Sequence, residues 1–323
     1  MFTKRIRIET GAPVYHCIGR IVGGALLLGD EEKEYFRRLM WRLAEFSGVE
    51  IITYCVMSNH IHLLVRVPTG VELSDRGILE RVVRYYGKRE PWVQTIVESV
   101  RRDGSLPASV RERLLARMGN VSMFMRTLKQ RFSKWYNRKY RRFGTLWAER
   151  FKSVLIEDCP DVLRTVAMYI DLNPARAGLV NDPKDYRYCG HAEAVAGNRA
   201  IRRETVALSE GSNWRQAVGE YRSRMMVYGA ESNRADKRAL SPKKVRQVLE
   251  QGGQVELGEV LRLKLRYFSD GLAFGSREFV EGVFEEFRDR FGAERRSGAR
   301  KVKGVGQCLG EVATLRELQK AAS

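Results

Sequence analysis

The sequence has few of the features that would cross-link, anchor or export a protein. Its five cysteines are scattered along 323 residues without a Cys-x-x-C pair, so neither a disulfide framework nor a zinc ribbon is indicated. The first residues lack the apolar core of a signal peptide, and the apolar run at residues 23–29 is far too short to span a bilayer. We therefore expect a cytoplasmic protein with reduced thiols and no membrane partner.

Acidic residues are also scarce relative to basic ones. The chain has 39 Asp and Glu against 58 Lys and Arg, which gives a net charge of +19. Such an excess favours a polyanionic partner, and nucleic acid is the commonest one. A protein of membrane surfaces would present a lipid-facing amphipathic segment, and none stands out. The apolar fraction of 44% allows a real core, so the chain is not disordered.

The apolar pattern predicts one domain over residues 1–195, with a helical insertion near residues 69–120 where proline and glycine interrupt the helical periodicity. Strands are predicted within residues 12–24, 49–57, 60–67 and 144–158, and helices within residues 29–48, 121–142 and 159–180. Ser58 and Asn59 lie between two of these strands, which predicts a tight antiparallel hairpin.

The composition becomes more charged after about residue 195. We interpret residues 196–323 as a separate, mostly helical basic module. Ser241 and Pro242 are typical of a helix start, and a second helix is predicted at residues 276–292. The basic stretch at residues 294–304 follows, and its sequence is not diagnostic of a function.

The chain has only four histidines, and His60 and His62 stand one residue apart in a predicted strand. Side chains on a strand alternate faces, so both imidazoles point away from the face of Ile61 and Leu63, about 6–7 Å apart along the strand. That spacing suits two ligands of one divalent ion, and it suits two structural histidines equally well. Histidine-triad nucleotide hydrolases need a third histidine where this chain has Leu64, so that class is excluded.

A tyrosine and an asparagine are spaced by one helical turn further along the chain. Tyr169 and Asn173 are i and i+4, which places them on one helix face about 5–6 Å apart. They could supply a phenolic nucleophile and an amide ligand, or they could be a packed tyrosine and an asparagine that ends the helix before Pro174. His16 and His191 are further candidate ligands, but they sit in no matching spacing.

Three segments together carry a resemblance to a known family. They are VMSNHIHLLV (56–65), NRKYRRFGTLWAERFKSVLIED (137–158) and YIDLNPARAGLV (169–180). In this combination the chain resembles the REP-associated tyrosine transposases, a branch of the HUH transposases that act on single-stranded DNA. The resemblance covers roughly residues 12–190 and is interrupted by the insertion.

The resemblance implies an α+β fold, in which a ferredoxin-like antiparallel sheet with helices forms the HUH nuclease core. It also implies that His60, His62 and Asn173 hold Mg²⁺ or Mn²⁺ and that Tyr169 attacks DNA to form a 5′-phosphotyrosine link. The implied activity is metal-dependent cleavage and strand transfer on hairpin or palindromic repeat DNA, as in DNA transposition. Whether the chain acts as a monomer or a homodimer stays open.

Ten basic side chains between residues 126 and 152 are predicted to contact DNA, because a one-signed excess suits phosphates. They are Arg126, Lys129, Arg131, Lys134, Arg138, Lys139, Arg141, Arg142, Arg150 and Lys152. The interleaved aromatic residues could stack on unpaired bases, but their helical spacing favours a place in the core. Two other functions stay open: a non-catalytic DNA-binding or regulatory protein derived from such a transposase, and an RNA-binding protein.

Overall fold

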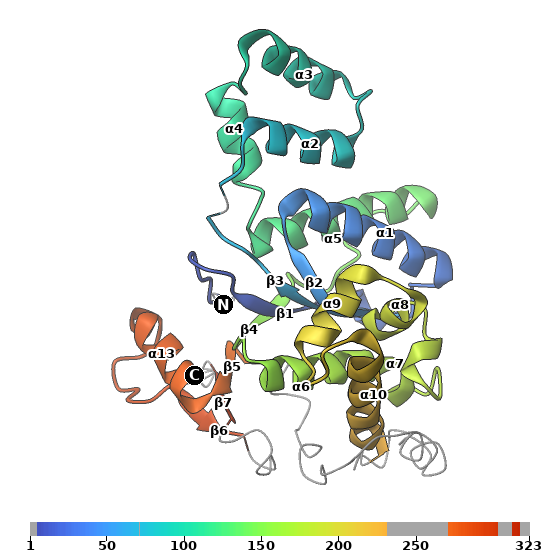
Figure 1. Ribbon diagram of the computed structural model, residues 1–323, viewed down its shortest axis with the longest axis vertical. Coiled ribbons are helices and arrows are strands. Elements are labelled where there is room, and N and C mark those ends of the chain that lie inside the picture. The colour runs from blue at the N-terminus through green and yellow to red at the C-terminus, as the bar shows by residue number, and fades with distance from the viewer. Residues whose placement is uncertain (1–4, 71, 231–270, 303–311, 317–323) are drawn as a thin grey trace.

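The computed structural model describes residues 5–70, 72–230, 271–302 and 312–316 (Figure 1). The strands are β1 (Val14–Arg20), β2 (Glu50–Val56), β3 (His60–Arg66), β4 (Lys152–Ile156), β5 (Ala273–Ser276), β6 (Ala299–Lys301) and β7 (Val312–Leu315). The helices are α1 (Asp30–Ser47), α2 (Asp75–Tyr86), α3 (Pro91–Asp103), α4 (Ala108–Leu115), α5 (Val121–Lys139), α6 (Pro160–Asp171), α7 (Asn173–Arg176), α8 (Gly190–Ala196), α9 (Arg199–Ala207), α10 (Trp214–Ala230) and α13 (Arg277–Glu286). The helix predicted after Ser241 and Pro242 lies outside the described residues.

Four neighbouring strands, in the order β2-β3-β1-β4, form the part of the sheet that carries the histidines. Every neighbouring pair among these four is antiparallel, and β2 and β3 form the predicted hairpin. Along the chain the order is β1, α1, β2, β3, α5 and β4, with α2–α4 inserted before α5. This order is that of a ferredoxin-like sheet, so the predicted α+β fold is confirmed.

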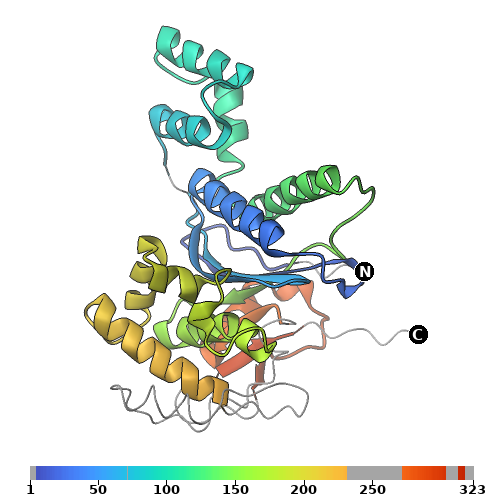
Figure 2. The same cartoon turned by 90° about the vertical axis from the view of Figure 1, so that its right-hand side faces the viewer.

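Helices cover both faces of this sheet (Figure 2). On one face α1 packs against α5, and Phe36 and Phe132 from these helices both contact Trp147. Ile61 points to this side, because its side chain lies beside Gly19 and Trp147. The residues that alternate with Ile61, including His60 and His62, therefore face the opposite side, where α6 packs against β2 and β3.

The predicted insertion is helical and projects away from the sheet beyond α1 (Figure 1). The Ser74 side chain caps α2, and Gly104 ends α3 in a left-handed conformation. The insertion is held to the core by aromatic packing, in which the Tyr85 ring of α2 stacks on Phe46 of α1 with the centroids 4.9 Å apart. Asn120 then caps α5 and returns the chain to the core.

The chain after residue 195 adds to the same sheet as well as covering it. Helices α8 and α9 pack against β2, and α10 packs against α9 and α6. Strand β5 then pairs in parallel with β4, and β7 and β6 continue the sheet beyond it. Sequence analysis does not predict these three strands, because each has only three or four residues and too few positions to show alternation. No helix among the described residues is long and apolar enough to cross a membrane.

Candidate active site

Strand β3 places the two histidines as the alternation predicts. The rings of His60 and His62 lie on the same face with their centroids 5.0 Å apart, and their planes are nearly perpendicular. His62 is 4% exposed, whereas His60 is partly exposed. The nitrogen Nδ1 of His60 lies 2.6 Å from Oδ1 of Asn59, the second residue of the hairpin turn. The turn thus fixes the orientation of the first imidazole.

A third histidine, His16 on β1, joins this pair. Its Nε2 lies 2.9 Å from Nδ1 of His62, and the two rings stack with centroids 5.1 Å apart. The register explains the contact, since Ile18 pairs with His62 and His16 with Leu64 on adjacent antiparallel strands. The sequence indicates His16 only as a candidate ligand and does not place it, because the pairing register of β1 with β3 cannot be deduced from either strand alone.

Helix α6 brings the candidate nucleophile to the histidines. The Tyr169 ring stands edge-on to both His62 and His16, with centroid distances of 5.8 Å and 6.1 Å. Tyr169 is only 5% exposed, and the guanidinium of Arg176 lies 5.5 Å from its ring centroid, within cation–π range. Residues more than 100 positions apart in the sequence therefore meet at one point.

Asn173 lies at the end of α6, where α7 begins. Its Nδ2 donates hydrogen bonds to the backbone carbonyl oxygens of Tyr169 at 3.0 Å and Ile170 at 3.1 Å. These contacts hold the amide against its own helix, and Oδ1 is the amide atom not engaged in them. The structure therefore joins Tyr169 directly to the histidines, while the contacts of Asn173 are with α6.

The chemistry of the histidine pair fits a divalent ion. A ligating imidazole usually donates its other ring N–H to a partner that fixes its orientation. If Nδ1 of His60 donates to Asn59 and Nδ1 of His62 donates to His16, each ring presents the lone pair of Nε2. Within the described residues, no group of three His, Cys, Asp or Glu side chains forms a complete metal site. Mg²⁺ is commonly held by few protein ligands together with substrate phosphates and water.

A buried carboxylate, missed by sequence reasoning, anchors the helix that carries Tyr169. Asp171 accepts hydrogen bonds from the Thr53 hydroxyl at 2.8 Å, the Tyr221 hydroxyl at 2.7 Å and the backbone N–H of His191 at 3.2 Å. Complete burial raises the pKa of Asp171 to about 6, although these hydrogen bonds oppose the rise. The only signal in the sequence is an acid that follows the apolar run Val166–Ile170 at the end of this helix, which has a second acid, Asp161, in its first turn.

Two of the ten predicted DNA contacts are engaged within the protein. Lys129 is 9% exposed, and its Nζ donates to the carbonyl oxygen of Glu149 at 2.7 Å. Burial lowers the pKa of Lys129 to about 8. Lys139 forms ion pairs with Glu31 at 2.6 Å and with Glu32 at 2.8 Å. Neither ammonium group is well placed to bind a phosphate.

Most of the other predicted DNA contacts are exposed, and two lie over aromatic rings. Arg131 lies over the rings of Tyr85 and Tyr86, and Arg142 lies over Tyr136. The exposed members are Arg126, Lys134, Arg138, Arg141, Arg150 and Lys152. A hollow of about 260 Å³ between α1 and α5 is lined by Tyr35, Leu39, Arg42, Arg131, Lys134, Trp135 and Arg138. This basic hollow lies on the face of the sheet opposite the histidines.

The aromatic residues of this segment are mainly core residues, as their spacing favours. Those that are buried are Phe132, Tyr136, Trp147 and Phe151. Trp135 stacks on Tyr35 of α1 with centroids 3.9 Å apart. Tyr140 and Phe143 are exposed, at 44% and 96%. Base stacking by this segment is therefore limited to a few side chains.

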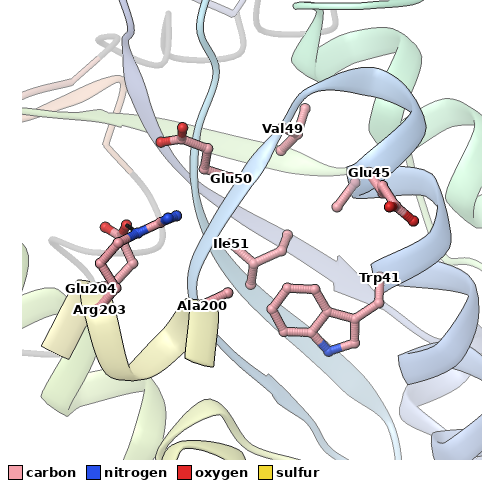
Figure 3. Close-up of a pocket in the computed structure, with 9 residues that line it drawn as sticks. Trp41, Glu45, Val49, Glu50, Ile51, Ala200, Arg203 and Glu204 are labelled. Carbon is pink, nitrogen blue, oxygen red and sulfur yellow. Dashed lines mark ion pairs between the residues drawn. The ribbon is translucent and has the colours of Figure 1, made fainter. Parts of the chain in front are cut away.

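A second hollow, of about 200 Å³, lies between α1, β2 and α9 (Figure 3). Its lining includes Trp41, Glu45, Glu50 and Glu204. Glu50 pairs with the last residue of β3, at the opposite end of that strand from His60. Because the polar lining is largely acidic and distant from the histidines, this hollow is not a candidate for binding nucleic acid.

Comparison with known proteins agrees with the family resemblance found in the sequence motifs. The model of the family described as "Transposase IS200 like" matches residues 14–94, which run from β1 into α3 and include both histidines. This match confirms the resemblance for the segment that carries the histidine pair.

Among solved structures, the chain is similar to a REP-associated tyrosine transposase bound to a REP hairpin, with 15% identity over 61% of this chain and 87% of that chain. The TM-score is 0.37, so the fold assignment depends on the strand order described above. No curated protein matches the chain.

Proposed function

We propose that the chain is a metal-dependent DNA endonuclease and strand transferase that uses Tyr169 as its nucleophile. The observation that carries the proposal is the contact of the Tyr169 ring with His62 and His16 on the face of β3 that carries His60. The substrate would be single-stranded DNA with hairpin or palindromic repeats, as the motif resemblance implies. All the contacting side chains belong to one chain, so the proposal does not require a homodimer.

The reaction conserves the number of phosphoester bonds. The phenolic oxygen of Tyr169 forms a bond to phosphorus while the bond from phosphorus to the 3′ oxygen breaks. The phenol loses its proton, and the 3′ oxygen takes one up to become a free 3′-OH. Since the 5′-phosphotyrosine link preserves the ester bond, attack by a 3′-OH on that link rejoins the DNA without an external energy source.

A phenol has an ordinary pKa near 10, so it needs help to attack a phosphodiester at neutral pH. We assign the metal-holding role to His60 and His62, each oriented through Nδ1, with Oδ1 of Asn173 as a third ligand. Mg²⁺ or Mn²⁺ bound there would neutralise charge on the phosphate and orient the leaving oxygen. Packing by α6 would keep the Tyr169 ring in place against the histidines.

We assign this activity to residues 1–195 and an accessory role to residues 196–323, in a protein acting in the cytoplasm. The exposed cations Lys134, Arg138 and Arg141 would bind DNA phosphates outside the histidine site. Their number and single sign support a polyanionic partner. Lys129 and Lys139 are left out of this set because of their contacts within the protein.

The test is covalent capture. The purified chain is incubated with hairpin-bearing single-stranded DNA and Mg²⁺ or Mn²⁺, and adducts are resolved on a denaturing gel. We expect a protein–DNA adduct that requires the metal and is lost in Tyr169→Phe. An adduct that persists in Tyr169→Phe would show that another residue is the nucleophile. DNA binding without any adduct in the wild type would favour the non-catalytic alternative.

A further inference from the structure

Strand β1 brings an arginine directly beside the histidine pair. Arg20 is the antiparallel partner of His60, and side chains of directly opposed residues point to the same face with Cβ atoms about 4.5–5.5 Å apart. Arg20 is exposed. A guanidinium thus stands on the surface next to the more exposed of the two histidines.

A lysine extends this arrangement to the next strand. Ile18 is the partner of His62 on one side and of Lys152 on the other. The three residues form a row across β3, β1 and β4, and strands lie about 4.8 Å apart. Lys152 is therefore on the order of 10 Å from His62, on the same face. Ile18, which is 3% exposed, forms an apolar floor between them.

Among the described residues, no carboxylate neutralises the charge on Arg20. Arg66, at the other end of β3, contacts the carboxylates of Glu50, Asp158 and Glu204 at 3.5, 3.1 and 2.9 Å. No carboxylate within the described ranges forms an ion pair with Arg20. Lys152 contacts Glu149 at 3.6 Å with both side chains nearly half exposed, and such surface pairs contribute only about 0–1 kcal/mol. The guanidinium of Arg20 is therefore available to a ligand, and Lys152, which has partners within the protein, is exposed on the same face.

We propose that Arg20 and Lys152 bind successive phosphates of the single-stranded DNA and set its path from the histidine pair across β1 and β4. The planar guanidinium of Arg20 suits bidentate phosphate contact beside the reacting phosphate, and Lys152 acts as a point charge further along the strand. The inference rests on the proposed function, and it assigns a path over β1 and β4 to the bound DNA strand. Arg20 lies outside the basic segment that the sequence singles out, so charge counting alone does not find it.

The first experiment measures how binding depends on salt. Every variant also carries Tyr169→Phe, so that equilibrium binding of an unpaired oligonucleotide is measured without cleavage. Each phosphate contact on a single strand contributes about −0.7 to the slope of log affinity against log salt. We expect Arg20→Ala and Lys152→Ala each to reduce the slope by about 0.7, and the double variant to reduce it by about 1.4.

Two further variants serve as controls in that experiment. Arg113→Ala removes the same charge from the exposed surface of α4 in the insertion (Figure 1), and it should leave the slope unchanged. Arg20→Lys keeps the charge and should retain most of the slope. The inference is overturned if Arg20→Ala and Lys152→Ala change the slope no more than Arg113→Ala does.

The second experiment locates the two phosphates. Single phosphates of the oligonucleotide are replaced one at a time by neutral methylphosphonates. A phosphate that Arg20 contacts should weaken binding when neutralised in the parent, and it should lose that effect in Arg20→Ala. We expect this position to adjoin the scissile phosphate and the Lys152 position to lie further from it on one side. Positions scattered along the strand, or coupled equally to both residues, would contradict a fixed path.

These measurements separate the inference from the proposed function. If the wild type forms no covalent adduct but the salt-dependence slopes fall as expected, Arg20 and Lys152 bind phosphates and the catalytic proposal fails. If the adduct forms and the slopes do not change, the catalytic proposal stands and the phosphate-binding role of Arg20 and Lys152 is wrong.

Discussion

The two faces of the four-stranded sheet β2-β3-β1-β4 use polar residues in opposite ways. On the α6 face, His16, His62 and Tyr169 are nearly buried and hold one another at ring-contact distances. On the α1 and α5 face most of the buried side chains are apolar, and the exposed cations of α5 stand at the rim of this layer. The comparison teaches that the density of positive charge in a sequence does not locate the chemistry. Positions for reactive groups require burial and fixed partners, whereas phosphate contacts require exposure.

The largest expected effect concerns Tyr169, the proposed nucleophile on the α6 face. Tyr169→Phe should reduce adduct formation by about 10³-fold or more, because removing a nucleophile removes the covalent step itself. The control is Tyr85→Phe, which lies on the other side of the molecule. The Tyr85 hydroxyl is buried and makes no hydrogen bond, so its loss should be nearly neutral. Equal activity of the two variants on a denaturing gel would remove Tyr169 from the reaction.

The next effect concerns the anchoring of α6. The pKa of Asp171 is raised from 3.8 to about 6 by burial, so this group favours folding below pH 3.8, and that contribution is lost as the pH rises through about 6. A shift of this size corresponds to about 3 kcal/mol. Urea unfolding from pH 4 to 8 should therefore show Asp171→Asn gaining stability relative to the wild type as the pH rises.

For an acid on the α1 and α5 face, Glu32, we expect the opposite dependence of stability on pH. Burial would raise the pKa of Glu32, but hydrogen bonds from Lys139 and Tyr140 lower it overall. Its stabilising contribution is present at neutral pH and is lost as the pH falls through its lowered pKa. Glu32→Gln should therefore lose most stability, relative to the wild type, at neutral pH. If both variants follow the wild-type pH profile, neither carboxylate has the environment described here.

The features that could be predicted from the sequence alone were those set by a local pattern. Alternation along β3 is a local property, so the shared face of His60 and His62 was predictable. The contact of His16 with His62 depends on the register of β1 against β3, and Asp171 gains its role only through Thr53 and Tyr221 from distant elements. The strands β5, β6 and β7 were not predicted because pairing with β4 and with one another, rather than any local pattern, makes them strands.

A smaller effect tests whether His16 acts through His62. His16→Ala removes the hydrogen-bond partner of Nδ1 of His62, which would otherwise help to fix the orientation of that ring. Loss of such a supporting contact typically costs 10–100-fold in metal affinity or activity. We expect the Mn²⁺ concentration needed for half-maximal adduct formation to rise by about that factor. Cys17→Ala alters the neighbouring buried residue of β1, which points to the α1 and α5 side, and should leave the metal requirement unchanged.

The smallest expected effect concerns two lysines of α5 that sequence reasoning treated alike. Lys134 is exposed, whereas Lys129 is 9% exposed and donates to the Glu149 carbonyl beneath Trp147. Lys134→Ala should reduce the salt dependence of single-strand binding by about 0.7 in slope, and Lys129→Met should not change it. Both variants lose one charge from the same helix, so net charge cannot explain a difference between them. An equal fall in slope would mean that Lys129 leaves its buried contacts to meet the DNA, and the contrast between buried and exposed cations drawn above would then fail.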